Sequence, residues 1–419
     1  MTDTVTIVGQ GYVGLPLAEA ASEVGWRVWG LEASSRVVTQ LNRGQSHVDD
    51  ISDQQLERML GRGYAATLDP SCVSRSQIVV ICVPTPLGDA GSPDLSAVTA
   101  AVTTIAPHLT SGTTVILEST TYPGTTEEVV LPLLSSGTHL TPNQEFLVAF
   151  SPERVNPGDK KFGIRNTPKL VGGLTKEASE AASAFYASFV EQVVVLSGPR
   201  EAETAKLLEN TFRHVNIALV NEMAKFCHEL GIDIWEVIRG ASTKPFGFMR
   251  FTPGPGVGGH CIPIDPNYLS FEVRKELGYP FRFVELAQEI NNSMPRYVVD
   301  RIVEALNDVG KPLNGSRVLL LGVTYKPDIA DQRESPAIPV ADILRQKKAR
   351  VEFYDPYVEN WAISDGSLER SRELEAAVLG ADIVVLLQAH SSFDVESLSS
   401  SAALFLDTQG VSSENVLRL

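Results

Sequence analysis

Cys261 stands in a segment that suits a reactive thiol. The segment, Val257–Pro266, is rich in glycine, with Gly258 among the residues that precede the cysteine, and it is bordered by ionisable side chains. Glycines allow backbone dihedrals that bring a sulfur close to a ligand, and a thiol there can form a covalent intermediate with a carbonyl carbon. His260 and Asp265 also permit a Cys-His-Asp hydrolase, although neighbours in a tight loop usually point apart. The other cysteines lie in apolar patterns that predict small buried side chains: Cys72, Cys82 and Cys227.

Lys206 and Asn210 form a second candidate pair. Residues four apart share one face of a helix, and the neighbours of this pair are mostly apolar. A lysine in a cleft can polarise an alcohol or stabilise an oxyanion, and an asparagine can orient a water or a sugar. An ordinary surface lysine is the alternative interpretation. No metal site is expected, because only His260 and Cys261 cluster among the candidate ligands.

A glycine-rich turn follows the first apolar segment. It has GxGxxG spacing and consists of Gly9, Gln10, Gly11, Tyr12, Val13 and Gly14. Such glycines let backbone N–H groups approach a pyrophosphate at a helix amino terminus. Glu32, at the end of the next apolar run, is placed to accept from both ribose hydroxyls and to repel the 2′-phosphate of NADP. The pattern predicts an NAD site, with Arg36 as a further contact or a solvated helix residue.

Short apolar runs alternate with helical patterns in the first third of the chain. This alternation predicts a parallel sheet covered by helices, with strands at Val5–Val8, Val28–Leu31, Ile78–Val83, Thr114–Leu117 and Leu147–Phe150. Helical periodicity then extends over 201–229 and 283–306. Between them the stretch 252–266 is crowded with Gly and Pro, which predicts a shaped loop.

After Pro312 the alternation returns and predicts a second α/β domain. Its expected strands are Val318–Val323, Val351–Tyr354, Ile383–Leu387 and Ala403–Leu406. A single glycine, Gly322, stands where a dinucleotide fold shows three, so a smaller nucleotide fragment is expected. Lys326 and Arg333 fall where ligands of open α/β sheets bind, and they are candidates to meet a diphosphate. Surface ion pairs with Asp328 or Glu334 are the alternative.

The predicted fold class is α/β, with two Rossmann-like doubly wound domains joined by a long central helix and a helical dimerisation region. At 419 residues the chain exceeds what one core usually serves. Its 35 Lys and Arg against 51 Asp and Glu give a net charge of −16, which repels polyanions, so neither nucleic acid nor a membrane surface is an expected partner. We expect a cytoplasmic protein, because no export signal or apolar stretch of the roughly 20 residues that span a bilayer is apparent.

Several blocks of the chain resemble the UDP-glucose/GDP-mannose dehydrogenase family, and together they cover essentially its whole length. They include GQGYVGLPLA, CVPTPL, ESTTYPGTT, FSPERVNPGD, GPGVGGHCIPIDP and GVTYKPDIADQRESPA. The PERVNPG stretch is most similar to bacterial UDP-N-acetylglucosamine (UDP-N-acetylhexosamine) 6-dehydrogenases. The resemblance implies a four-electron oxidation of a UDP-sugar at C6 to the uronic acid, with two NAD per sugar and a thiohemiacetal and thioester on Cys261.

The resemblance also implies roles for single residues. Lys206 would stabilise the oxyanion, Asn210 and Asp265 would hold a water and the lysine, and Thr121 with Glu153 would position a water. Further cofactor contacts would be Pro84, Thr85, Thr121 and Lys326, and substrate contacts would be Glu153, Arg154, Val155, Lys206, Asn210, Arg250, Gly258, Lys326 and Arg333. The family's second acid after the Pro-Glu pair is replaced by Pro157. Its inter-subunit arginine is missing where Pro245 stands, so Lys244 or Arg250 is a candidate substitute.

The expected domains are 1–200 for NAD binding, 201–310 for the helical region with the cysteine loop, and 311–419 for UDP-sugar binding, in a homodimer or higher homo-oligomer. UDP-N-acetylglucosamine is the favoured substrate, with UDP-glucose 6-dehydrogenase and UDP-N-acetylmannosamine dehydrogenase as alternatives. Two other classes stay open. A two-electron hydroxyacid dehydrogenase would use Lys206 and Asn210 alone, and a non-catalytic nucleotide-sugar sensor would not need Cys261.

Overall fold

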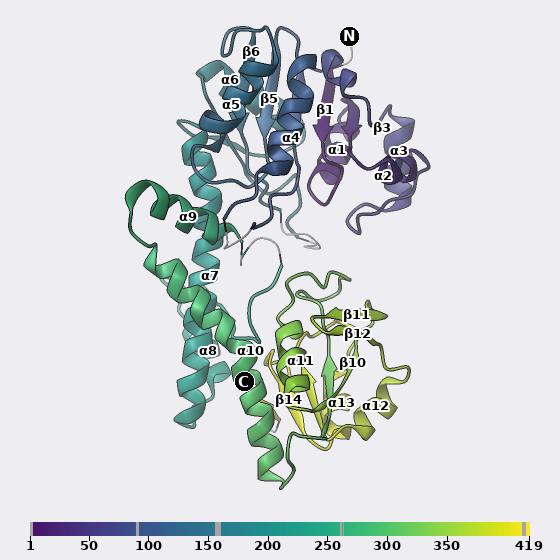
Figure 1. Ribbon diagram of the computed structural model, residues 1–419, viewed down its shortest axis with the longest axis vertical. Helices are drawn as coiled ribbons and strands as arrows, with labels where there is room; N and C mark the ends of the chain where they lie inside the picture. Colours follow the sequence, from purple (N-terminus) through teal and green to yellow (C-terminus); the bar gives the residue numbers. More distant parts are fainter. Residues whose placement is uncertain (1–2, 89–91, 156–160, 260–261, 263, 413–415) are drawn as a thin grey trace. The chain divides into compact units, whose positions relative to one another are not determined.

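The computed structural model describes residues 3–88, 92–155, 161–259, 262, 264–412 and 416–419. The chain divides into two compact units (Figure 1). Unit 1 comprises Met1–Glu209 and Asn267–Tyr279, and unit 2 comprises Asn210–Pro266 and Pro280–Leu419. His260 and Cys261 lie outside the described residues.

Unit 1 contains an eight-stranded sheet with the order β3-β2-β1-β4-β5-β6-β7-β8. Its strands are β1 (Thr4–Val8), β2 (Arg27–Leu31), β3 (Ala65–Thr67), β4 (Ile78–Ile81), β5 (Thr113–Leu117), β6 (Phe146–Phe150), β7 (Lys169–Gly173) and β8 (Val193–Val195). Neighbouring strands are parallel except β6 and β7, which run antiparallel. The predicted parallel sheet is therefore confirmed, and an antiparallel connection extends it.

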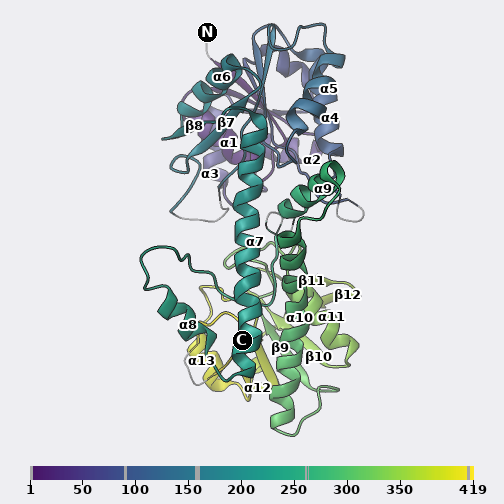
Figure 2. The same ribbon diagram turned by 90° about the vertical axis from the view of Figure 1, so that its left-hand side faces the viewer.

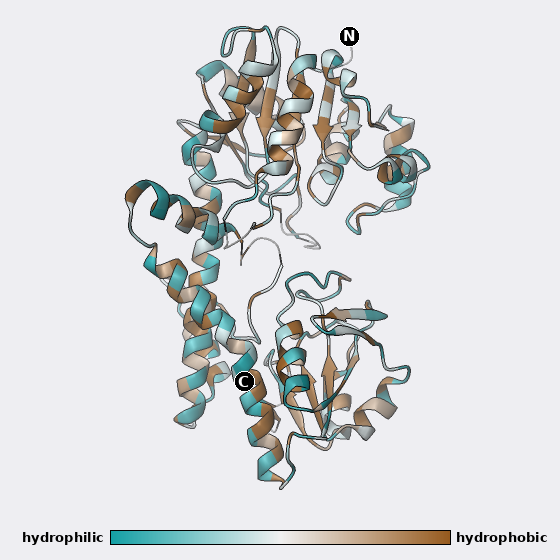
Figure 3. Cartoon of the chain, in the orientation of Figure 1, coloured by the Kyte–Doolittle hydropathy of each residue, from teal (hydrophilic) through white to brown (hydrophobic). Residues whose placement is uncertain are grey.

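Helices cover both faces of this sheet. They are α1 (Gly14–Glu23), α2 (Ser35–Asn42), α3 (Asp53–Gly61), α4 (Ser96–Ile105), α5 (Leu131–Gly137) and α6 (Lys176–Ala187), with short turns at η1 (Pro70–Arg75), η3 (Ala106–His108) and η4 (Thr126–Val130). Successive residues of a strand point to opposite faces. Accordingly Ile78 belongs to one buried cluster and Val79 to another. Two apolar layers explain why these strands are almost uniformly hydrophobic (Figure 3).

Unit 2 contains a five-stranded parallel sheet with the order β10-β9-β13-β14-β15. Its strands are β9 (Arg317–Leu321), β10 (Arg350–Tyr354), β13 (Ile383–Leu386), β14 (Phe405–Asp407) and β15 (Leu417–Arg418), and a separate hairpin pairs β11 (Asn360–Ile363) with β12 (Gly366–Glu369). The helices are α8 (Ile234–Ala241), α10 (Arg282–Asp308), α11 (Ala337–Gln346), α12 (Leu374–Gly380) and α13 (Val395–Ser401). The second Rossmann-like domain is thus confirmed.

A long helix, α7 (Pro199–Glu229), begins in unit 1 and ends in unit 2, as the apolar periodicity predicts (Figure 2). Its second half lies beside α10, where Asn221 Nδ2 donates to Asn291 Oδ1 at 2.9 Å. The Gly- and Pro-rich stretch is irregular through 259, but α9 (Asp265–Leu277) begins inside the segment expected to be loop. The expectation missed this start because proline, a loop signal elsewhere, is tolerated in the first turn of a helix. Among the described residues, no helix is long and apolar enough to cross a membrane.

Candidate functional site

The glycine turn after β1 is shaped by two of its three glycines. Gly9 has φ +89°, and a Cβ there would lie 2.7 Å from the Cys82 carbonyl oxygen. A Cβ on Gly14 would lie 1.9 Å from the Gly9 carbonyl oxygen. A Cβ on Gly11, by contrast, would meet no described atom within 4 Å. The chain's own packing does not explain Gly11, whereas the close approach of a pyrophosphate to the backbone does.

Glu32 lies directly after β2, beside this turn. Its carboxylate accepts hydrogen bonds from the backbone N–H groups of Gln10 and Ser34, each at 3.0 Å. The side chain is half-buried, and these two bonds fix its orientation. This arrangement fits an acid that receives ribose hydroxyls. Arg36, on the first turn of α2, is exposed.

Two further predicted cofactor contacts follow β4. The Thr85 carbonyl accepts a hydrogen bond from the Tyr268 hydroxyl of α9, which also donates to the Pro86 carbonyl at 3.0 Å. Pro84 is exposed. The structure therefore brings the Pro84–Pro86 segment to the carboxyl edge of the sheet that also carries the glycine turn, where ligands of such sheets bind.

Glu153, just after β6, is the centre of a buried polar group in unit 1. Its carboxylate accepts from the Val155 N–H, its carbonyl accepts from Lys206 Nζ at 2.6 Å, and Lys169 Nζ lies 3.5 Å from its Oε2. Burial raises the pKa of Glu153, while the Val155 N–H and the Lys206 ammonium act in the opposite direction. A buried carboxyl with a shifted pKa is typical of a proton-transfer group.

Thr121 and Arg154 lie in the loops after β5 and β6. Thr121 is 1% exposed, and within the described residues its hydroxyl makes no hydrogen bond. A buried hydroxyl without a partner costs free energy, so a ligand or water is the natural partner for it. Arg154 forms an ion pair with Glu209 at 2.7 Å and donates to the Pro168 carbonyl at 2.5 Å.

Asn210 and Asp265 meet in unit 2, although they are 55 residues apart. Asn210 Nδ2 donates to Asp265 Oδ2, and both residues are nearly inaccessible, at 6% and 3% exposure. Lys206, 9% exposed, lies one turn before Asn210 on α7. One helix therefore carries a residue of each polar group.

The predicted nucleophile, Cys261, falls outside the described residues, but the glycines before it are described. A Cβ on Gly258 would lie 2.7 Å from Tyr325 Cβ, and a Cβ on Gly259, which has φ +84°, would lie 2.7 Å from the Tyr325 ring. Only glycine allows this loop to pack against Tyr325, the residue before Lys326. The cysteine loop and the turn after β9 are consequently adjacent in unit 2.

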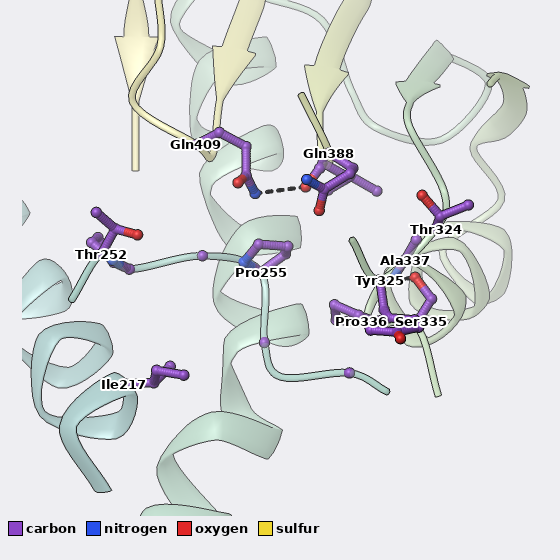
Figure 4. A pocket seen from close by; sticks show the side chains of 15 residues that line it. Ile217, Thr252, Pro255, Thr324, Tyr325, Ser335, Pro336, Ala337, Gln388 and Gln409 are labelled. Carbon is purple, nitrogen blue, oxygen red and sulfur yellow. Dashed lines mark hydrogen bonds between the residues drawn. The ribbon is translucent and has the colours of Figure 1, made fainter. Parts of the chain in front are cut away.

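A cavity of about 160 Å³ lies beside this contact (Figure 4). Its walls come from the 252–258 loop, the turn after β9 and the ends of β13 and β14, with Tyr325, Gln388 and Gln409 among the lining residues. Gln409 Nε2 donates to the Leu387 carbonyl at 2.7 Å, which fixes one wall. The cavity occupies the carboxyl edge of a parallel sheet, the usual ligand position of this fold.

The remaining cationic candidates are placed differently. Arg333 makes a two-point ion pair with Asp331, with bonds of 2.8 and 2.7 Å. Lys326 is half-buried in the turn after β9. Lys244 and Arg250 are exposed.

Comparison with known proteins identifies all three parts of the chain. Residues 3–190 match the NAD binding domain, 200–293 the central domain and 319–414 the UDP binding domain of the UDP-glucose/GDP-mannose dehydrogenase family. The chain belongs to this family. It is therefore an NAD-dependent nucleotide-sugar dehydrogenase, and the resemblance seen in the sequence is confirmed.

Several similar proteins within this family have names that refer to N-acetylated sugars. The chain is 36% identical to the UDP-N-acetyl-D-mannosamine dehydrogenase of Pyrococcus horikoshii, over 93% of this chain and 90% of that protein. It is 35% identical to the NDP-N-acetyl-D-galactosaminuronic acid dehydrogenase of Ralstonia nicotianae, over 97% and 96%. The solved structure of the Pyrococcus enzyme superimposes with a TM-score of 0.89, at 34% identity over 99% and 98% of the two chains. These relatives act on N-acetylated sugars, by their names.

Sequence reasoning missed two buried charged residues near the predicted site. Lys169 opens β7, a strand that was not predicted, so no pattern singled it out. Glu203, fully buried on α7, accepts from the N–H groups of Gly124 and Thr126 at 2.6 and 3.0 Å and from the Thr126 hydroxyl at 2.7 Å. It thereby anchors the loop that carries Thr121. The position of this glutamate on the apolar face of the predicted helix indicates a buried carboxylate.

Proposed function

We propose that this enzyme oxidises the C6 alcohol of UDP-N-acetylmannosamine to the carboxylate, with two NAD consumed per sugar. The observation that carries the choice of sugar is the 36% identity, over nearly the whole chain, to a UDP-N-acetyl-D-mannosamine dehydrogenase. This replaces UDP-N-acetylglucosamine, which the sequence alone favoured. UDP-N-acetylglucosamine and UDP-glucose become the comparison substrates.

The reaction divides into two oxidations and a hydrolysis. Bound in unit 1, NAD would supply the hydride acceptor for C6 in each oxidation. Between them, the thiolate of Cys261 adds to the C6 aldehyde and forms a thiohemiacetal, which the second oxidation converts to a thioester. Water then cleaves the thioester to give the uronic acid and the free thiol.

The described residues support this sequence of steps. Lys206, whose ammonium is already held at the Glu153 carbonyl, is the group we assign to the developing oxyanion. Glu153 would accept a proton from the attacking water, and the Thr121 hydroxyl, which makes no hydrogen bond within the described residues, would place that water. The Asn210–Asp265 pair would fix the helix face that meets the sugar.

The second sheet supplies the site that we propose for the UDP moiety. The cavity beside Tyr325 is lined by loops at the carboxyl ends of three strands, and Lys326 lies in one of them. We assign the diphosphate to Lys326 and Arg333 and the base to the cavity. In a chain with net charge −16, such local cations are what draws an anionic substrate.

A substrate panel tests the proposal. Purified enzyme with NAD is given UDP-N-acetylmannosamine, UDP-N-acetylglucosamine, UDP-glucose and GDP-mannose separately, and NADH formation is followed by absorbance. We expect kcat/KM for UDP-N-acetylmannosamine to exceed that of each other sugar by about tenfold or more. Faster turnover of any other sugar would overturn the assignment of the substrate.

We also infer a homodimer that covers the apolar stripe of α7. Four of its large side chains recur at spacings of four or seven residues and are 45–63% exposed: Leu208, Phe212, Leu219 and Phe226. An exposed stripe of this kind on a soluble enzyme marks a protein interface. Light scattering during gel filtration is expected to give at least twice the chain mass of 45.4 kDa, and a monomer at micromolar concentration would contradict it.

A further inference from the structure

Lys169 is a buried cation that the mechanism above leaves without a task. It is the first residue of β7 and is 5% exposed. Its ammonium forms an ion pair with Glu118, which follows β5 and is 1% exposed. Burying an ammonium and a carboxylate is costly, so this pair calls for a reason beyond the packing of the sheet.

The Lys169 ammonium also lies close to an aromatic ring and to a second carboxylate. Its Nζ lies 4.9 Å from the centroid of the Tyr186 ring and 3.5 Å from Glu153 Oε2. Glu118 is held in turn by the Cys82 thiol, which donates to its Oε2 at 3.2 Å. Burial lowers the pKa of the Lys169 ammonium to about 7, the neighbouring Cys82 raises it, and the Lys206 ammonium lowers it further.

We propose that Lys169 is a positioning residue for Glu153: fixed by Glu118, its ammonium orients the Glu153 carboxylate and stabilises the anionic form that receives a proton. This inference rests on the proposed function, in which Glu153 acts on the hydrolytic water. Among the described residues, the glutamate is faced by the cations Lys169 from β7, Lys206 from α7 and Arg154 from its own loop. Of these, Lys206 contacts the carbonyl of Glu153 and Lys169 approaches the carboxylate.

The two lysines therefore contact different groups of Glu153. Lys206 Nζ donates to the main-chain oxygen of Glu153 and acts on the carboxylate through its charge alone. The Lys169 ammonium contacts Glu118, the Tyr186 ring and Glu153, so its charge acts directly on the Glu153 carboxylate. A nearby cation favours the charged form of a carboxylate, and removing the Lys169 charge raises the pH at which Glu153 becomes a base.

The test compares three variants by the pH profile of kcat, using the sugar that the wild-type enzyme oxidises best. Lys169→Met keeps the length of the side chain and removes the charge, whereas Lys169→Arg keeps the charge. Lys169→Met combined with Glu118→Gln avoids leaving a buried unpaired carboxylate, should the single variant fail to fold. We expect the acid limb of the profile to move up by about one pH unit in both Met variants, so that kcat is about tenfold lower at pH values below the wild-type limb. In Lys169→Arg the limb stays near its wild-type position.

A purely structural role would lower the melting temperature and leave the acid limb in place. A folded double variant whose acid limb coincides with that of the wild type would therefore overturn the proposal. The second readout needs no turnover: the ¹³C carboxyl resonance of Glu153, assigned by its loss in Glu153→Gln, titrates at higher pH in the double variant than in the wild type. Equal titration points would overturn the inference, even if the substrate panel rejected the proposed function.

Discussion

The sheets of the two units have the same turn after their first strand, built from different sequences. In unit 1, Gly9 N–H donates to the Leu31 carbonyl at 2.8 Å and the next N–H, of Gln10, donates to Glu32. In unit 2, Gly322 N–H donates to the Tyr354 carbonyl at 3.0 Å and the next N–H, of Val323, donates to Asp355 at 2.8 Å. Each glycine has a positive φ, +89° and +73°. An acid after the second strand thus braces the turn after the first in both units.

The two acids differ in what else they meet. Asp355 is fully buried, and its Oδ2 lies 2.9 Å from His390 Nε2. The other His390 nitrogen accepts from the Asp328 N–H at 3.0 Å, so Nε2 carries the hydrogen and donates to Asp355. Hydrogen bonds from His390 and Val323 lower the pKa of Asp355 against the opposing effect of burial. Glu32 is half-buried and accepts only backbone N–H groups in the described chain.

The same turn is therefore compatible with two different ligands. In unit 1 we propose that the acid accepts from a ribose and that the space beside Gly11 admits a pyrophosphate. In unit 2 a histidine uses that capacity, and the Asp355–His390 pair secures the loop that carries Lys326 instead. On the proposed function, the first turn binds its ligand through an acid and the second through a cation.

The largest expected effect separates chemistry from cofactor binding. Cys261→Ser removes the thiolate that would form the thioester, so uronic acid formation should fall by at least about 1,000-fold. The NAD dissociation constant, measured by calorimetry, should stay within about twofold of the wild type, because the turn of unit 1 is untouched. Substantial uronic acid formation by Cys261→Ser would remove Cys261 from the mechanism.

Glycine substitutions sharpen the comparison of the turns. Gly14→Ala and Gly322→Ala place a Cβ 1.9 and 2.2 Å from a carbonyl oxygen, so each should lower the free energy of unfolding by about 3 kcal/mol. Gly11→Ala meets no described atom and should change it by less than about 0.5 kcal/mol. It should nevertheless weaken NAD binding at least about tenfold, because the methyl group occupies the pyrophosphate approach. Unchanged NAD affinity in Gly11→Ala would refute that placement.

Substitution of the acid after the second strand gives a smaller effect, on NAD affinity in unit 1 and on stability in unit 2. Glu32→Gln should weaken NAD about tenfold, improve the relative use of NADP and leave stability nearly unchanged. Asp355→Asn should lower the free energy of unfolding by about 2 kcal/mol, because a buried network loses its charged acceptor, and leave NAD affinity unchanged. If the two variants changed NAD affinity and stability in the same way, the proposed difference between Glu32, which binds NAD, and Asp355, which stabilises its turn, would be wrong.

The smallest effect concerns pH. Burial raises the pKa of Glu203, in unit 1, to about 7, and lowers the pKa of His214, in unit 2, to about 4. The glutamate therefore costs stability as pH rises from about 4.5 to 7, and the histidine costs stability as pH falls from about 6.5 to 4. Relative to the wild type, the melting temperature of Glu203→Gln should improve from pH 5 to pH 8, and that of His214→Gln from pH 8 to pH 5. Calorimetric scans at the two pH values check both signs.

The sequence predicts the sheets well because their strands are buried on both faces and read as continuous apolar runs. It predicts the glycine turn and Glu32 because close backbone approach restricts residue types. It does not predict the Asn210–Asp265 contact from spacing, since the pair forms only when a loop returns to α7; the family resemblance supplied Asp265. Lys169 and the Asp355–His390 pair were not predicted for the same reason. Their partners come from different strands, and a single charged residue in a sequence does not indicate which distant residue it contacts.

The number of NADH molecules formed per sugar tests the central claim most directly. With UDP-N-acetylmannosamine limiting and NAD in excess, the reaction is run to completion, and NADH and uronic acid are both quantified. We expect two NADH and one uronic acid per sugar, with no free aldehyde. One NADH per sugar, with an aldehyde as the product, would contradict the four-electron oxidation.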